Sequence, residues 1–416
     1  MSTVARLRLF EAYGVELEYM IVDRRTLSVL PITDEVLRAV AGRYASDVEQ
    51  GEITWSNELV LHVIELKTTG PAPSLDGLPE KFQENVRRIN DLLEPLGARL
   101  MPTAMHPWMD PLEETRLWPH EYNAVYETFN RIFDCRGHGW SNLQSTHINF
   151  PFADSEEFGR LHAAIRLVLP VLPALAASSP IVEGRLTGLL DNRMEFYRNN
   201  SRKIPSVAGL VIPEPVFDPD EYDRTILQRI YRDLSPHDAE GVLQEEFANA
   251  RGAIARFERG SIEIRVVDVQ ECPAADLALC HAVSAVLRAL VEQRWTGLVE
   301  QQSLAAEPMA DILAAVIRDG ERAVIRDPAY LAQFGVAATR CTAGELWRRL
   351  VDATCLLSGA SSGDWQDALN VMLDQGPLAR RILRRLAPDP SCERASAVYR
   401  ELCDCLALGR PFSIAD

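Results

Sequence analysis

Apolar and polar residues alternate with a period of two in four short segments of the chain. These segments are Tyr13 to Val22, Glu58 to Leu66, Ser145 to Phe150 and Ser261 to Val269. Such alternation predicts strands with one buried face.

Helical spacing of apolar residues lies between these segments. Phe82, Val86, Ile89 and Leu93 recur every three to four positions, which predicts a helix. Helices are predicted over residues 78–96, 121–133, 156–177 and 274–295, and in several amphipathic pieces beyond. Residues 213–245, rich in proline and charge, are predicted to run over the surface.

Strands interrupted by helices, followed by a helical C-terminal third, predict an α+β fold with a mainly antiparallel sheet. No repeat or low-complexity linker marks a domain boundary. We therefore expect a catalytic domain over residues 1–300, with the helical region 301–416 packed on the same domain. The alternative is a separate helical domain that begins near residue 300.

Charge and composition narrow the function. The chain has 43 lysines and arginines against 60 aspartates and glutamates, a formal net charge of -17, which disfavours nucleic acid as a partner. The N-terminus lacks a signal-peptide pattern, and the apolar run around Ile165 to Ala177 is too short to span a bilayer. We expect a cytoplasmic protein without a membrane partner. The eight cysteines, scattered without a CxxC pair, indicate reduced thiols.

Carboxylates stand out on the polar faces of the predicted strands. Glu16 and Glu18 are two residues apart, so they share one face of a strand. Parallel carboxylates repel unless a cation lies between them, and hard divalent metals prefer oxygen ligands. The same alternation pairs Glu263 with Arg265, and His147 with Asn149. Each pair alone also fits a solvated strand face or a structural histidine.

Glu58 and Glu65 pose a separate problem, because they are seven residues apart. In a helix this spacing returns to nearly the same face, whereas a regular strand places the two side chains on opposite faces. Either a bulge intervenes or only one of them reaches the site, and Glu65 is then the better candidate.

These pieces occur in the order shown by glutamate-cysteine ligases, especially the bacterial carboxylate-amine ligase subfamily. The chain resembles that family in five motifs: G-x-E-x-E at Gly14 to Glu18, E-x6-E at Glu58 to Glu65, T-H-x-(H/N) at Thr146 to Asn149, A-S-S-P-x-x-x-G-R at Ala177 to Arg185, and E-x-R-x-x-D at Glu263 to Asp268. Asn149 stands where the subfamily commonly has histidine, and the sequence after Arg185 differs in detail.

The resemblance implies a saddle-shaped antiparallel sheet backed by helices, related to glutamine synthetase, and a possible homodimer. It makes Glu18 and Glu65 ligands of one Mg²⁺ ion, for which Mn²⁺ can substitute. Glu16, His147 and Glu263 would hold a second ion, and Glu58 would lie near a third.

The resemblance also implies roles for several arginines. Arg265 would reach the substrate or the transferring phosphoryl group, and Arg193 with Tyr197 would contact substrate. Arg185, Arg193, Arg198 and Arg202 crowd one stretch of an acidic chain, which predicts a positive lobe for ATP phosphates or a substrate carboxylate. A basic solvated helix or loop is the alternative.

Such a site suits ATP-dependent amide formation. ATP converts a carboxylate, glutamate by resemblance, into an acyl phosphate, and an amine then displaces phosphate; positioning and charge neutralisation are what this chemistry needs. The acceptor amine does not follow from the sequence. The alternatives are a glutamine-synthetase-like or guanidino kinase activity, or a catalytically idle metal- or nucleotide-binding regulator on the same fold.

Overall fold

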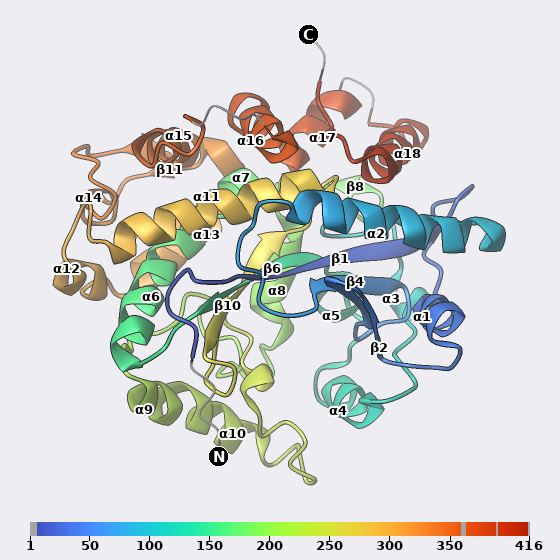
Figure 1. Cartoon of the computed structure of the whole chain (residues 1–416), viewed down its shortest axis with the longest axis horizontal. Coiled ribbons are helices and arrows are strands. Elements are labelled where there is room, and N and C mark those ends of the chain that lie inside the picture. Colours follow the sequence, from blue (N-terminus) through green and yellow to red (C-terminus); the bar gives the residue numbers. More distant parts are fainter. Residues whose placement is uncertain (1–5, 359–362, 388–389, 415–416) are drawn as a thin grey trace.

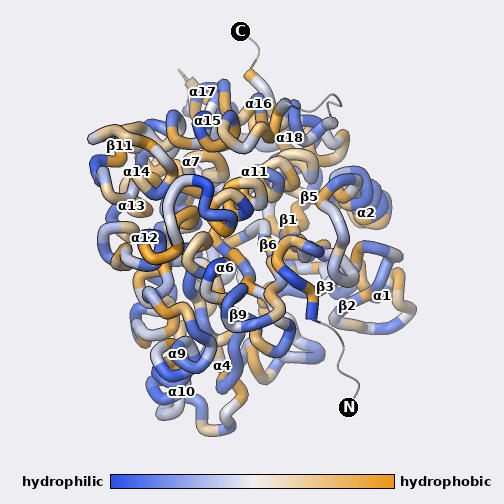
Figure 2. Tube along the Cα trace, turned by 60° about the vertical axis from the view of Figure 1, so that its left-hand side comes forward, coloured by the Kyte–Doolittle hydropathy of each residue, from blue (hydrophilic) through white to orange (hydrophobic). Residues whose placement is uncertain are grey.

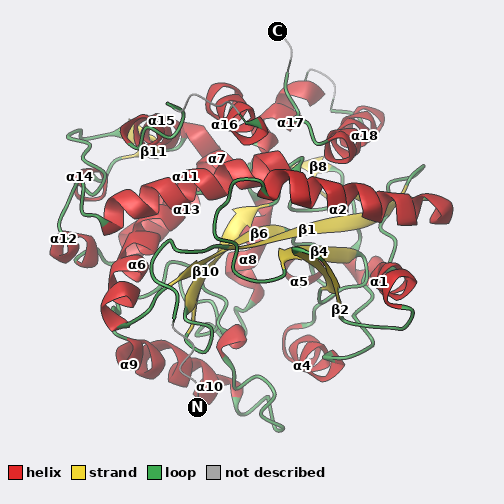
Figure 3. Cartoon of the chain, in the orientation of Figure 1, coloured by secondary structure: helices red, strands yellow, loops and turns green. Residues whose placement is uncertain are grey.

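The computed structural model describes residues 6–358, 363–387 and 390–414. A large sheet crosses the middle of the protein (Figures 1 and 3), and the long helices α2 (Leu78–Leu93) and α11 (Pro273–Val291) run along one side of it. This large antiparallel sheet backed by helices confirms the predicted α+β fold class.

The large sheet has eight strands, in the order β2-β3-β4-β1-β6-β10-β9 with β5 paired to β1. All of its described strand pairs are antiparallel. The strands are β1 (Gly14–Asp23), β2 (Asp47–Gln50), β3 (Ile53–Asn57), β4 (Val63–Thr68), β5 (Ala98–Met101), β6 (Ser145–Pro151), β9 (Ala253–Arg256) and β10 (Ser261–Asp268). Two small two-stranded sheets pair β7 (Ile181–Val182) with β8 (Arg185–Leu186), and β11 (Val324–Ile325) with β12 (Cys341–Thr342).

The other regular secondary structure of the described residues consists of helices and short 3-10 or π turns. Before β10 these are α1 (Thr33–Ala41), η1 (Glu94–Leu96), α3 (Pro111–Glu114), α4 (Asn123–Phe133), α5 (His138–Ser141), α6 (Ser155–Val168), η2 (Leu169–Val171), α7 (Pro173–Ala176), α8 (Asn192–Asn200), α9 (Pro219–Tyr222), η3 (Asp223–Leu227), α10 (Gln228–Leu234) and η4 (Glu246–Ala248). After α11 come α12 (Leu298–Gln302), α13 (Ala306–Asp319), η5 (Gly320–Arg322), α14 (Pro328–Ala332), α15 (Ala343–Ala353), α16 (Asp364–Gln375), α17 (Leu378–Leu386) and α18 (Cys392–Leu408).

The helix-covered face of the sheet forms the main core. Val15, Leu17 and Tyr19 of β1 are fully buried in one cluster with the apolar side of α2, including Phe82 and Val86. Hydrophobic and hydrophilic residues alternate along α2 (Figure 2), as expected for a helix with one buried side. Full burial of each such side chain contributes about 1.5–3 kcal/mol. Because the apolar side chains of β1 point into this core, its carboxylates point to the opposite face.

Two predicted segments differ from the structure. The segment Glu58 to Leu66 is not one strand, because β3 ends at Asn57 and β4 begins at Val63. Residues 213–245 contain α9, η3 and α10, and they bury Tyr222, Ile226 and Ile230 rather than lying only on the surface.

The C-terminal helices pack on the helices that cover the large sheet and on its strand β5 (Figure 1). Helix α16 packs against α11, and α18 packs against β5 and α2. Helix α11 is long and apolar enough to cross a membrane by length and composition. However, 83% of its most apolar window is buried inside the protein, so this is weak evidence for a membrane span.

Candidate active site

The centre of the candidate site is the pairing of β1 with β6. His147 lies directly opposite Glu16 in the strand register. Its Nδ1 atom is 3.0 Å from Oε2 of Glu16, and its Nε2 atom is 3.7 Å from Oε1 of Glu18. Glu18 also accepts hydrogen bonds from the backbone N–H and the hydroxyl of Ser145, at 2.7 and 3.0 Å. The sheet register thus brings together side chains that are about 130 residues apart in the sequence.

Titration of these groups reflects the crowding of carboxylates. Burial disfavours the charged form of His147, but the hydrogen bond to Glu16 and the charges of Glu18 and Glu16 raise its pKa to about 9. Burial likewise opposes ionisation of Glu16, yet the hydrogen bond and charge of His147 lower the pKa of this carboxyl. The carboxylates around His147 therefore stabilise a positively charged group at this position.

Strand β4 adds Glu65 to the same face. Glu65 lies opposite Glu18 on one side and opposite Ser56 of β3 on the other. It accepts hydrogen bonds from the hydroxyl of Ser56 and from Nζ of Lys67, the latter at 2.7 Å. Burial, and then the charge of Glu16, raise the pKa of Glu65 to about 7. Lys67 was missed in the sequence, although its spacing from Glu65 places it on the same strand face.

Glu58 also lies at the site, but on a loop and not on a strand. It lies in the loop between β3 and β4, so neither a helix nor a bulged strand accounts for its spacing from Glu65. Its carboxylate accepts a hydrogen bond from the N–H of Leu59 at 3.3 Å. Burial and the charges of Glu18 and Glu65 raise the pKa of Glu58 well above its usual range. Of the two alternatives that the spacing left open, a bulge or only one carboxylate at the site, neither holds: Glu58 lies in a loop, and both carboxylates line the basic cavity.

Strand β10 supplies the other wall of the cluster. Oε1 of Glu263 lies 3.9 Å from Nδ1 of His147 and 3.1 Å from Nε of Arg265. Its Oε2 atom accepts a hydrogen bond from Arg256 at 3.4 Å. Asn149, opposite Glu263 in the register, donates from Nδ2 to Glu16 at 3.1 Å.

Glycine at position 14 is explained by the same packing. Gly14 lies opposite Asn149, and a Cβ atom there would be 3.0 Å from Cβ of Asn149. The first glycine of the G-x-E-x-E motif therefore allows the close approach of β1 and β6 next to the carboxylates.

Two groups of side chains in this cluster fit a divalent cation. Their potential ligand atoms lie within 4.8 Å of one another in each group: Glu16, His147 and Glu263 in one, and Glu18, Glu65 and His147 in the other. Carboxylate oxygens with an imidazole nitrogen suit Mg²⁺ or Mn²⁺. The first group is the ligand set implied by the family resemblance, and the second contains the other implied pair.

The arginines expected to contact substrate occupy different places. Arg193 of α8 is buried: its guanidinium lies 3.4 Å from Asp268, donates to the backbone carbonyl of Arg265 at 2.7 Å, and lies over the ring of Tyr197. Both Arg193 and Tyr197 line a cavity beside the cluster. Asp268, the last residue of the E-x-R-x-x-D motif, was not among the expected site residues.

The predicted positive lobe does not form at the site. Arg185 is exposed on β8 and lines neither of the two cavities that adjoin the cluster. Arg198 is exposed and pairs with Glu195 at 2.8 Å, and Arg202 is exposed as well. Arg193 and Arg198 point in different directions from α8, and Arg185 and Arg202 lie outside this helix, so closeness in sequence did not bring the four together.

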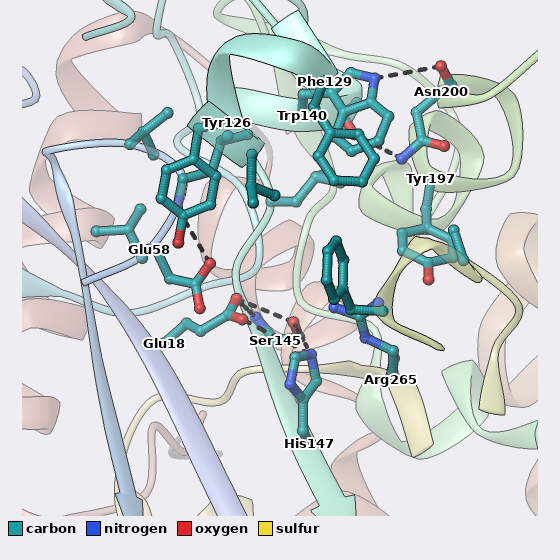
Figure 4. Close-up of a pocket in the computed structure, with 18 of the residues that line it drawn as sticks. Glu18, Glu58, Tyr126, Phe129, Trp140, Ser145, His147, Tyr197, Asn200 and Arg265 are labelled. Carbon is teal, nitrogen blue, oxygen red and sulfur yellow. Dashed lines mark hydrogen bonds and ion pairs between the residues drawn. The ribbon is translucent and has the colours of Figure 1, made fainter. Parts of the chain in front are cut away.

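Two cavities meet at the carboxylate cluster, and Glu58, Tyr122, Tyr126, His147 and Arg265 line both. We name them by their walls. The basic cavity, named for its five cations, has a volume of about 930 Å³ and is lined by Arg6, Lys67, Arg256, Arg259 and Arg265. Asn149 and six carboxylates, Glu16, Asp47, Glu58, Glu65, Glu258 and Glu263, also line it. The aromatic cavity has a volume of about 440 Å³ and is lined by Phe129, Trp140, Phe247, Tyr197, Val125 and Glu18, among others (Figure 4).

Comparison with known proteins agrees with this arrangement. The model of Glutamate-cysteine ligase family 2 (GCS2) matches residues 12–401. An uncharacterized protein of Archaeoglobus fulgidus is 33% identical over 393 residues, which are 94% of this chain and 98% of that protein. A Rubrobacter xylanophilus protein named "putative glutamate–cysteine ligase 2-3" is 28% identical over 279 residues, 65% of this chain and 68% of its own length.

A solved structure shares the fold. The glutamate–cysteine ligase of Francisella tularensis, crystallised in complex with AMP, superposes with a TM-score of 0.58 at 12% identity and covers 95% of this chain and 93% of its own. The family match and the carboxylate cluster define an ATP-dependent ligase that forms carbon–nitrogen bonds between a carboxylate and an amine. The chain belongs to glutamate-cysteine ligase family 2.

Proposed function

We propose that this ligase joins the γ-carboxylate of glutamate to an amine through an acyl phosphate and releases ADP and phosphate. The observation that carries the proposal is the position of the carboxylate cluster, which lies where the basic and aromatic cavities meet. The basic cavity carries cations that can donate to phosphate oxygens, and the aromatic cavity has room for organic substrates.

The basic cavity fits the polyphosphate of ATP. Its five cations supply donors for phosphate oxygens, and its six carboxylates need bound divalent cations before a polyanion can lie beside them. Mg²⁺ ions, when bound by the two ligand groups, would neutralise the phosphate oxygens and orient the terminal phosphate. The surrounding carboxylates fix where such ions can lie.

Arg265 is the residue that fits the transferring phosphoryl group. It lines both cavities. Its guanidinium forms an ion pair with Glu263 and therefore lies at the edge of the carboxylate cluster. A planar guanidinium can donate to two phosphoryl oxygens at once. These hydrogen bonds would stabilise the negative charge that develops on the phosphoryl oxygens during transfer.

The proposed reaction has two steps, phosphoryl transfer and amide formation. An oxygen of the glutamate γ-carboxylate attacks the terminal phosphorus of ATP, and the bond from that phosphorus to the bridging oxygen of ADP breaks. The amine nitrogen then attacks the acyl carbon, its proton is lost, and phosphate leaves. The amide bond is formed without any oxidant or reductant.

Divalent-dependent release of ADP tests the proposal. Purified protein with ATP, Mg²⁺ and glutamate should release ADP when hydroxylamine is present, and the glutamyl hydroxamate should be detectable by mass spectrometry. The Glu16→Gln variant is the matched control, because it keeps the side-chain shape and removes one carboxylate of the cluster. No hydroxamate from glutamate would refute this donor, and glutamine or phosphoguanidine as product would favour the related kinase or synthetase reactions.

A further inference from the structure

The aromatic cavity has a wall that no part of the phosphoryl-transfer chemistry explains. Phe129 of α4, Trp140 of α5 and Phe247 of η4 line it, and each ring is only partly buried. The ring centroids of Phe129 and Trp140 are 5.3 Å apart, and those of Phe129 and Phe247 are 6.5 Å apart. Partly exposed rings from three separate elements that face one cavity form a surface for an apolar ligand group.

Polar atoms at this end of the cavity are already paired with each other. Trp140 donates its indole N–H to the carbonyl oxygen of Asn200 at 3.3 Å, and the Asn200 amide donates to the carbonyl of Gly139 at 2.9 Å. The amide oxygen of Asn200 accepts from the hydroxyl of Ser201 at 2.8 Å. A ring with its own hydrogen-bonding edge, such as adenine, would leave polar atoms unpaired here, whereas a hydrocarbon ring would not.

The opposite end of the cavity is acidic. Glu18 and Glu58 line it close to His147 (Figure 4), and their oxygens can accept hydrogen bonds from an amine. Of the two arginines in this lining, Arg193 is engaged by Asp268 and by the carbonyl of Arg265, and Arg265 pairs with Glu263 at 3.1 Å. The cavity therefore suits a molecule with an amino group at one end and an apolar ring at the other.

We propose that the acceptor of this ligase is a primary amine that carries an aromatic ring or an apolar group of similar size. The inference rests on the proposed function, because it assigns the acceptor of that reaction. The amino group lies at the carboxylate cluster, where the acyl carbon is formed, and the ring lies against Phe129, Trp140 and Phe247. A volume of about 440 Å³ leaves room for the ring as well as the reacting carboxylate.

Steady-state kinetics with a small set of amines test the proposal. The kcat/KM for ADP release with glutamate should be at least about 30-fold higher for 2-phenylethylamine than for ethylamine, because the ring buries apolar area that ethylamine lacks. Mass spectrometry should identify the phenylethyl amide. Equal values for the two amines, or a higher value for cysteine than for 2-phenylethylamine, would overturn the proposal.

A pair of matched variants tests whether the ring of the amine binds against Phe247. Phe247→Ala should raise the KM for 2-phenylethylamine about tenfold and leave that for ATP unchanged. Phe217→Ala removes an equal ring from a partly buried position outside both cavities and should leave both constants within about twofold of wild type. If Phe247→Ala instead raised the KM for ATP alone, the cavity would hold the nucleotide base and the proposal would be wrong.

Two further measurements separate this proposal from the proposed function. Glutamyl hydroxamate without a preference for the aromatic amine would overturn the acceptor assignment alone. If no hydroxamate forms, the Kd values of 2-phenylethylamine and ethylamine, measured by calorimetric titration of the protein, still test which amine the aromatic cavity binds. Tighter binding of the aromatic amine that is lost in Phe247→Ala supports the assignment, and equal binding of both amines refutes it.

Discussion

The guanidinium of Arg193 donates a hydrogen bond of 2.7 Å to the backbone carbonyl of Arg265. This contact lies where the pairing of β10 with β6 shifts register, between Ile264 and Val267. Asp268 holds the other side of the Arg193 guanidinium at 3.4 Å. Arg193 thus ties helix α8 to the irregular part of β10 and positions the residue that we assign to the phosphoryl group.

Arg193→Lys should lower kcat by about 10- to 100-fold, because an ammonium can pair with Asp268 but cannot also hold the Arg265 carbonyl in the same geometry. The Kd for Mg²⁺ should change little, since Arg193 contacts none of the proposed ligands. Kinetics and calorimetry measure the two quantities. A wild-type kcat would show that the position of Arg265 does not depend on this contact.

Arg265→Lys tests the phosphoryl contact itself. We expect kcat to fall by about 100-fold or more, while the Kd for Mg²⁺ stays within a few-fold, because lysine keeps the charge and loses the planar fork. A change confined to Mg²⁺ affinity would place Arg265 in metal binding and not in transfer.

Glu263→Gln should abolish nearly all activity with little loss of fold. The amide keeps the shape of the side chain but removes a negative ligand from the group with Glu16 and His147. The melting temperature without metal should stay the same or rise, because one repulsive charge is gone. Glu84→Gln, on the exposed side of α2, is the control. Activity of Glu263→Gln within a few-fold of wild type would contradict the metal assignment of this residue.

The pH dependence of stability should reflect a buried histidine. His62 is fully buried, and burial, then the neighbouring His106, lower its pKa to about 3 from about 6.5, against a smaller opposing effect of the Ser141 backbone. Between these values the unfolded chain binds a proton that the folded chain does not, so the free energy of unfolding falls as the pH falls.

His62→Leu should therefore reduce the slope of the decline of stability between pH 6 and pH 4, and His106, His162 and His281, whose pKa values burial also lowers, should account for part of what remains. Denaturant unfolding of both proteins across this range measures the effect. An unchanged slope in the variant would show that His62 is not the group responsible.

For most members of the carboxylate cluster, alternation in the sequence predicted which face of its strand carries the side chain. Glu16, Glu18, His147 and Glu263 each lie on a strand whose apolar partners face the core, so their direction follows from the period of two. Which strands are neighbours came from the family resemblance and not from the pattern. The structure supplies the register that places Glu16 opposite His147.

What the sequence could not predict depends on loops and on distant segments. Glu58 lies in a loop, where alternation carries no information about direction. The wall of the aromatic cavity combines Phe129 with Phe247, which meet only through the tertiary fold. Arg185 was assigned from its motif, and a two-residue strand turns it to solvent.

The fate of one oxygen atom tests the central claim most directly. Glutamate labelled with ¹⁸O in its γ-carboxylate, incubated with ATP, Mg²⁺ and the acceptor amine, should transfer one labelled oxygen to inorganic phosphate, and the nucleotide product should be ADP. This follows from our proposal, because metals bound by Glu16, Glu18, Glu65, His147 and Glu263 would suit the terminal phosphate, where negative charge is densest. AMP and pyrophosphate as products, with the label in AMP, would contradict an acyl phosphate mechanism even if the amide bond were formed.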